Sequence, residues 1–188
     1  EFMAAVLTSE MQNTDSIVFL IDDCRINGLE VFPPSINMSF YQFHASDEKT
    51  IVYGLGAIKG VGEAAMQSVI DSRLQDGPYK DLFDFCHRID LKKINKRTLE
   101  ALIRSGALDC LGIERSSLMA QLPEAVQAAD QARSNRETGL MDLFGAVEEV
   151  KRKPDKPVKH WSDEVRLKGE KAVAYQHLTL PTIGSVLI

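Results

Sequence analysis

The sequence has no apolar run long enough to cross a bilayer, only three cysteines and a single tryptophan. A helix that spans a membrane needs about 20 consecutive apolar residues. The N-terminus also lacks the basic, apolar and small-residue regions of a signal peptide. These absences predict a cytoplasmic chain with no membrane partner and argue against a secreted, disulfide-rich protein.

Residues that usually bind metals or act as nucleophiles are few and scattered. The cysteines lie far apart among apolar neighbours, which is typical of reduced core residues; they are Cys24, Cys86 and Cys110. The histidines have no spacing that suggests a metal site or a catalytic triad; they are His44, His87, His160 and His177. Asp22 and Asp23 are adjacent, so on a helix their side chains diverge by about 100° and should form a solvated face. No catalytic residue and no metal site are predicted.

Positive charge is in deficit, because 22 lysines and arginines stand against 27 aspartates and glutamates, giving a net charge of -5. This balance argues against a uniformly basic surface that binds nucleic acid. Residues 87–104 depart from it, since they hold six basic residues against Asp90 and Glu100. The six are Arg88, Lys92, Lys93, Lys96, Arg97 and Arg104. A local basic patch can contact phosphates while the rest of the surface stays acidic.

The N-terminal part of the chain predicts one helix and a small ribbon. Apolar residues recur at helical spacing over about residues 15–27, after the capping-type residue Asn13. The two prolines that follow exclude a helix, and residues 29–32 favour a short strand. Alternating apolar residues in 41–45 and 51–53, separated by a polar turn, predict a two-stranded hairpin.

Beyond Gly54 the pattern is almost wholly helical. Helices are predicted over residues 62–74, 81–88, 96–104, 116–133 and 162–171, with the fourth interrupted near Pro123. The predicted fold class is mainly α, a helical bundle with a small N-terminal β-hairpin element.

Two glycines in "IKGVGEAAMQSVIDSR" stand where a helix must begin. Gly60 and Gly62 permit a turn too tight for side chains, while Val61 supplies an apolar contact. Such a turn leaves backbone N–H groups free at the positive end of the helix dipole, where a single phosphate can approach. This helix-hairpin-helix arrangement reads no bases, and Lys59 can add charge. The alternative is that the glycines only close a turn inside a bundle.

A related unit follows in residues 95–122. Apolar residues form one helical face, a short turn runs from Gly106 to Gly112, and a second apolar face begins after it. Two such units packed back to back would track both strands of a duplex. The sequence therefore favours tandem helix-hairpin-helix motifs.

Three stretches closely resemble the alpha subunits of bacterial DNA polymerase III, the replicative polymerase: "DDCRINGLEVFPPSIN", "IVYGLGAIKGVGEAAMQSVIDSR" and "LFDFCHRIDLKKINKRTLEALIRSGALDCLG". The resemblance runs from about residue 4 to residue 171. It implies the end of the family's fingers region in residues 4–54 and a tandem helix-hairpin-helix domain that holds duplex DNA in residues 55–133. It also implies a linker with a clamp-binding peptide and a short helix in residues 134–171.

The resemblance places the first hairpin at Lys59, Gly60, Val61 and Gly62. We predict that the basic run adds DNA contacts through Lys92, Lys93, Lys96 and Arg97.

In this family the polymerase chemistry uses palm aspartates that hold two metal ions, which clamp the attacking and leaving oxygens. Those aspartates are absent from this sequence. The resemblance implies a DNA-directed DNA polymerase, a nucleotidyltransferase, as the parent protein, with Mg²⁺ in its own active site and other holoenzyme subunits as partners. The chain itself is expected to hold no cofactor and to be inactive alone.

The resemblance further implies a short internal peptide that docks into the sliding clamp, the beta subunit. In the family this peptide usually begins with glutamine; here the aligned residues are Leu140, Met141, Asp142, Leu143 and Phe144. Leu143 and Phe144 would be apolar anchors, whereas Leu140 cannot supply the hydrogen bonds of a glutamine amide. We expect clamp binding that is present but weakened. The alternative is that the peptide folds back onto the domain.

The C-terminal end of the chain departs from the family. Residues 172–188 replace the leucine-glycine-tyrosine segment that the resemblance leads one to expect, and they are predicted to be a non-native tail without function. The first three residues are expected to carry no fold information.

Two other functions remain open. One is a pure protein-interaction scaffold that presents the clamp peptide without touching DNA. The other is a helix-hairpin-helix enzyme such as a base-excision glycosylase, which needs a catalytic aspartate or lysine in a base pocket beside the hairpin.

Overall fold

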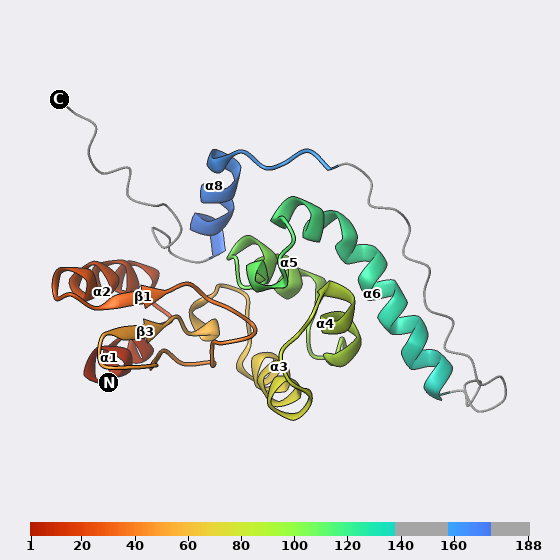
Figure 1. Cartoon of the computed structure of the whole chain (residues 1–188), viewed down its shortest axis with the longest axis horizontal. Helices are drawn as coiled ribbons and strands as arrows, with labels where there is room; N and C mark the ends of the chain where they lie inside the picture. Colours follow the sequence, from red (N-terminus) through yellow and green to blue (C-terminus); the bar gives the residue numbers. More distant parts are fainter. Residues whose placement is uncertain (138–157, 174–188) are drawn as a thin grey trace.

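The computed structural model describes residues 1–137 and 158–173. Figure 1 shows two groups of elements, with α1, α2 and a small sheet at one end, α3 to α6 at the other, and α8 against α5. The helices are α1 (Phe2–Ser9), α2 (Thr14–Ile26), α3 (Glu63–Asp76), α4 (Leu82–Arg88), α5 (Lys96–Arg104), α6 (Arg115–Glu137) and α8 (Asp163–Val173). Short 3-10 turns cover Leu55–Ala57 and Asp109–Leu111. The predicted fold class, mainly α with a small β element, is confirmed.

The sheet has three strands, of which two form the predicted hairpin. β2 (His44–Ala45) pairs antiparallel with β3 (Thr50–Val52), so the predicted hairpin is present. β1 (Glu30–Phe32) adds to the other edge of β3 in parallel. The sequence predicted a strand at residues 29–32 but not its place in the sheet, because this pairing joins segments far apart in the sequence. Val31 and Ile51, which pair in this register, are both buried in the core.

Phe2 and Met3, two of the first three residues, lie within α1, contrary to expectation. Phe2 is 77% exposed, but Met3 packs against the core, as do the buried Ala4 and Leu7. α1 packs against α2 and β2. The apolar side chains of this segment recur at helical spacing and bury a stripe against its neighbours, which is the usual source of stability for a short helix.

Polar side chains fix where three helices begin. Asn13 accepts a hydrogen bond from the Ser16 N–H at α2, Asp81 from the Asp84 N–H at α4, and Asn95 from the Thr98 N–H at α5. Each bond satisfies an N–H group that the first turn of a helix leaves without a partner. These caps explain why the predicted starts of the three helices lie within one residue of the observed ones.

α6 continues through Pro123, where a break was predicted. Proline removes one backbone hydrogen bond from a helix interior. On either side of Pro123, however, buried residues anchor the helix: Leu118, Leu122, Ala125 and Ala129. Their spacing places them on one face, and α6 packs chiefly against α4. Burial of this face outweighs the loss of one bond.

Two of the cysteines are core residues and the third is not. Cys24 and Cys86 are buried, and burial raises the pKa of the Cys86 thiol to about 12. Cys110 is exposed, which corrects the expectation that all three are buried. It lies on the 3-10 turn after α5, whose apolar contacts come from its neighbours Leu108 and Leu111.

None of the helices in residues 1–137 and 158–173 is long and apolar enough to cross a membrane.

Candidate nucleic-acid interface

The first hairpin, residues 59–62, joins the 3-10 turn at residues 55–57 to α3. Gly60 has φ +82°, a left-handed conformation that side chains disfavour. Val61 is 8% exposed and anchors the turn in the core, and its N–H donates to the Ile58 carbonyl at 3.2 Å. Gly62 precedes α3 with extended backbone, φ -87° and ψ 149°. A Cβ at Gly60 or Gly62 would meet no atom within 4 Å, so the backbone is open there.

The start of α3 leaves backbone donors unused. In the described ranges, no acceptor contacts the N–H groups of Gly62, Glu63 or Ala64. They lie at the positive end of the helix dipole, where an anion is favoured. Glu63 is in the first turn and carries a negative charge of its own, which reduces that attraction. Lys59 is exposed, but its N–H is already donated to the Val173 carbonyl at 2.7 Å.

The N-terminus of α5 lies beside the first hairpin. The Thr98 hydroxyl donates to the Gly60 carbonyl at 3.0 Å, which joins residues 38 positions apart. Lys96 and Arg97 are on the same turn of α5 and are exposed, although Lys96 also approaches Glu100 at 3.8 Å. The turn of α5 that carries these two predicted DNA-binding residues therefore lies next to Gly60 of the first hairpin.

Lys92 and Lys93 lie on the loop before α5 and are exposed. Asp90 orders this loop, because its side chain accepts the Lys92 N–H at 3.0 Å and its carbonyl accepts the Lys93 N–H at 2.9 Å. A groove of about 370 Å³ separates the loop from α6, with Lys92 and Lys96 on one side and Arg133 on the other. Lys92 and Lys96 thus border a hollow rather than a flat surface.

Arg88 does not join the basic patch. It donates to the carbonyls of Ser72 and Gly77, both at 2.8 Å, and pairs with Asp84 at 3.2 Å. Its guanidinium also lies 4.3 Å from the centre of the Tyr79 ring. This arginine ties α4 to the end of α3, so counting it as surface charge was wrong.

The second hairpin, residues 106–114, joins α5 to α6. Gly112 has φ +73°, Ile113 follows, and Glu114 directly precedes α6. This order matches Gly60, Val61 and Gly62 before α3. The position equivalent to Gly62 is thus a glutamate, whose side chain is 56% exposed and lies 3.9 Å from His160.

Arg115, the first residue of α6, is the centre of an ionic cluster in which Arg115 and Glu170 are buried and Asp109 is partly exposed. Its guanidinium donates to Asp109 at 2.6 and 2.7 Å, to the Arg104 carbonyl at 3.2 Å and to Glu170 of α8 at 2.5 Å. Burial opposes the charge of Arg115, but hydrogen bonds and Coulomb attraction from Asp109 and Glu170 outweigh it and raise the pKa of Arg115. A Cβ at Gly106, where φ is +81°, would collide with this guanidinium.

Sequence reasoning did not find this cluster. Arg115 and Glu170 are 55 residues apart and no local spacing connects them. The one available signal was the glycine at 106, since a glycine can mark a place that another group approaches closely.

Several predicted residues cannot be placed. Leu140, Met141, Asp142, Leu143 and Phe144 lie outside the described residues, as does the tail from residue 174. The predicted start of that tail, at residue 172, falls inside α8.

No group of three or more histidines, cysteines or carboxylates in residues 1–137 and 158–173 is arranged to hold a metal ion. Asp22 is exposed and pairs with Arg25 at 3.3 Å, as a solvated helix face should.

Comparison with known proteins agrees with the geometry. A family model described as a helix-hairpin-helix motif matches residues 28–118. The chain is 49% identical over 183 residues to the DNA polymerase III subunit alpha of Vibrio cholerae, and 47% over 197 residues to that of Pseudomonas aeruginosa. It is 44% identical over 190 residues to the same subunit of Escherichia coli K12.

These alignments cover 95%, 95% and 100% of the chain but only 16%, 17% and 16% of the relatives. The predicted resemblance is confirmed, and the chain spans less than a fifth of the length of the curated relatives it matches.

Proposed function

Because the chain is homologous to one segment of the DNA polymerase III alpha subunits, we propose that it binds the backbone of duplex DNA within such a polymerase. The observation that carries this proposal is the first hairpin, an exposed glycine turn with open N–H groups at the start of α3. Synthesis of DNA would be the activity of the whole polymerase. This chain would hold the duplex and would be inactive alone.

The contact we propose is to a single phosphate. Its oxygens would accept hydrogen bonds from the N–H groups of Gly62, Glu63 and Ala64, with the dipole of α3 adding attraction. Lys59 directly precedes Gly60, and Lys96 and Arg97 directly precede Thr98, whose hydroxyl bonds to the Gly60 carbonyl. These three basic side chains would neutralise neighbouring phosphates. Contacts to phosphate carry no direct sequence information, so binding should not depend on base sequence.

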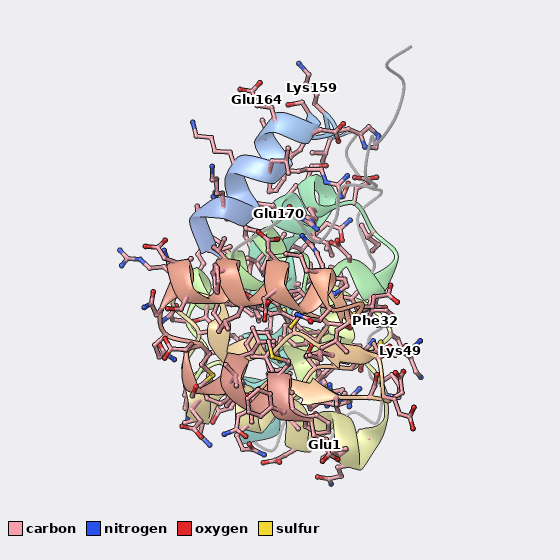
Figure 2. The ribbon with its side chains drawn as sticks, turned by 90° about the vertical axis from the view of Figure 1, so that its left-hand side faces the viewer. Glu1, Phe32, Lys49, Lys159, Glu164 and Glu170 are labelled. Carbon is pink, nitrogen blue, oxygen red and sulfur yellow. The ribbon has the colours of Figure 1, made fainter. Side chains whose placement is uncertain are left out.

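A fluorescent duplex tests this function. The whole chain should bind it with an affinity that falls roughly ten- to a hundredfold between about 50 and 200 mM salt, as expected for two to four phosphate contacts. The double variant Lys96→Glu, Arg97→Glu should remove most of the binding. Lys49→Glu is the control for a single charge reversal. Lys49 lies on the turn between β2 and β3, outside both hairpins (Figure 2). No binding at low salt, or an affinity that does not change with salt concentration, would contradict the proposal.

We also propose that residues 140–144 tether the polymerase to its sliding clamp, with Leu143 and Phe144 as the apolar anchors. The support is the family resemblance of this peptide alone. Replacing both anchors with alanine should abolish binding to purified clamp and leave duplex binding unchanged. If duplex binding is absent while clamp binding is present, the chain is a protein-interaction scaffold instead. The other holoenzyme subunits are proposed partners, and the cytoplasm the proposed compartment.

Mg²⁺ chemistry, which the family implies, does not fit the described residues. Asp22 and Asp23 bond to Arg25 and Asn27 on their own helix, and no third ligand faces them in the described part of the chain. We therefore assign this chain no step of the reaction that uses a metal.

A further inference from the structure

α8 contacts the start of α6 and the first hairpin through two residues that lie one turn apart. Glu170 accepts a hydrogen bond from Arg115, and the two side chains are 1% and 4% exposed. Three residues later, the Val173 carbonyl accepts the Lys59 N–H at 2.7 Å. The C-terminal end of α8 therefore holds both the residue that begins α6 and the residue that leads into the first hairpin.

The position of Glu170 is strongly determined. A buried carboxylate is tolerated only where its charge is compensated, and Arg115 provides that compensation. Arg115 is itself fixed by Asp109 and by the Arg104 carbonyl. Figure 2 shows Glu170 pointing from α8 into the body of the molecule, whereas Glu164 points away from it. Since one helical turn separates Glu170 from Val173, fixing the first also fixes the second.

Apart from the buried Val61, the first hairpin has few restraints of its own. Gly60 lacks a side chain and has a backbone conformation that it leaves readily. Among the described residues, two hydrogen bonds join it to parts of the chain that are distant in sequence: the Thr98 hydroxyl donates to the Gly60 carbonyl, and the Lys59 N–H donates to the Val173 carbonyl. The second of these depends on the place of α8.

We propose that Glu170 is a positioning residue for DNA binding. Its ion pair with Arg115 holds α8 so that the Val173 carbonyl orients the Lys59 peptide, and with it the open N–H groups at Gly62. α8 acts through the hairpin rather than on phosphate, because the end it presents carries carbonyl groups and the negative end of a helix dipole. This inference rests on the proposed function and assigns α8 a role within it.

The test compares Glu170→Gln with Glu164→Gln in the whole chain. Both changes remove one negative charge from α8, but only the first removes the buried ion pair. Duplex affinity is measured at about 50 mM salt, together with hydrogen exchange of residues 58–64, at a temperature where both variants keep full helicity. E170Q should weaken binding roughly five- to tenfold, as for coupling between separated sites, and should speed exchange at Lys59. E164Q should change neither.

A merely structural role would lower the unfolding midpoint of E170Q without changing the affinity of the folded chain. Duplex binding by E170Q equal to that of the wild type overturns the positioning role and leaves the proposed function standing. A wild-type chain that does not bind the duplex overturns the proposed function, and the inference fails with it. If E170Q does not fold, Glu170→Asp keeps the charge but shortens the side chain. Weakened binding by E170D then supports the positioning role, and unchanged binding overturns it.

Discussion

The first and second hairpins share a backbone plan but differ in what surrounds it. Each has three successive positions before a helix: a glycine with positive φ, then an aliphatic residue, then the residue that directly precedes the helix. Gly62 occupies that last position in the first hairpin and leaves the start of α3 bare. Glu114 occupies it in the second hairpin. The next residue, Arg115, forms ion pairs with Asp109 and Glu170.

This difference indicates that two copies of a motif need not have the same function. The first hairpin has open donors beside Lys96 and Arg97, which suits a phosphate. The second has a carboxylate at the equivalent place and its arginine turned inward, which suits the joining of α5, α6 and α8. Two symmetric DNA contacts, as the tandem pattern implies, are therefore not what these side chains favour. The following predictions test this division of roles.

The largest expected effect is on stability at the second hairpin. Arg115→Met would leave Glu170 and Asp109 without their partner, and breaking a buried pair in this way costs about 3–5 kcal/mol. Lys59→Met, at the first hairpin, changes an exposed side chain and should cost less than about 0.5 kcal/mol. Urea unfolding of the two variants measures the difference. Similar free energies of unfolding for both would remove the distinction between the hairpins.

The next effect is on DNA binding at the first hairpin. Gly62→Glu gives it the residue of the second hairpin, and the added charge should weaken duplex binding about tenfold through loss of roughly one phosphate contact. Stability should change little, because the backbone at Gly62 is extended and a Cβ meets no atom within 4 Å. Gly62→Gln is the neutral control for size. Equal losses in G62E and G62Q would show that space, rather than charge, governs the site.

The smallest effect is the reverse exchange. Glu114→Gln removes the carboxylate that distinguishes the second hairpin and should tighten duplex binding about two- to threefold at low salt. The gain should disappear as salt rises, because an exposed charge is screened. Binding titrations at two salt concentrations measure it. A gain that persists at high salt would point to a direct hydrogen bond, and no gain would place this hairpin away from the duplex.

Local chemistry explains what the sequence predicted well. The starts of α2, α4 and α5 follow from capping residues at Asn13, Asp81 and Asn95, and the turn at Gly60 follows from its glycine. These signals lie within a few residues of the structure they determine. The exposure of Lys96 and Arg97 on the neighbouring turn of α5 agrees with the basic run.

What could not be predicted depends on distant partners. The parallel pairing of β1 with β3, the continuation of α6 through Pro123 and the inward turn of Arg88 are all decided by packing against other elements. The ion pair of Arg115 with Glu170 is the extreme case, since neither residue carries a local signal of the other. Tertiary contacts of this kind override local preference, and local patterns in a single sequence do not reveal them.

The exposure of Cys110 has a practical consequence for separating the two hairpins. The other two cysteines of the chain, Cys24 and Cys86, are buried, and burial raises the pKa of both thiols, so thiolate-dependent alkylation should be slow there. A maleimide dye added to the native chain should therefore attach at Cys110, four residues before Glu114, without any engineered mutation. Quenching or energy transfer from that dye would show how close a labelled duplex comes to the second hairpin.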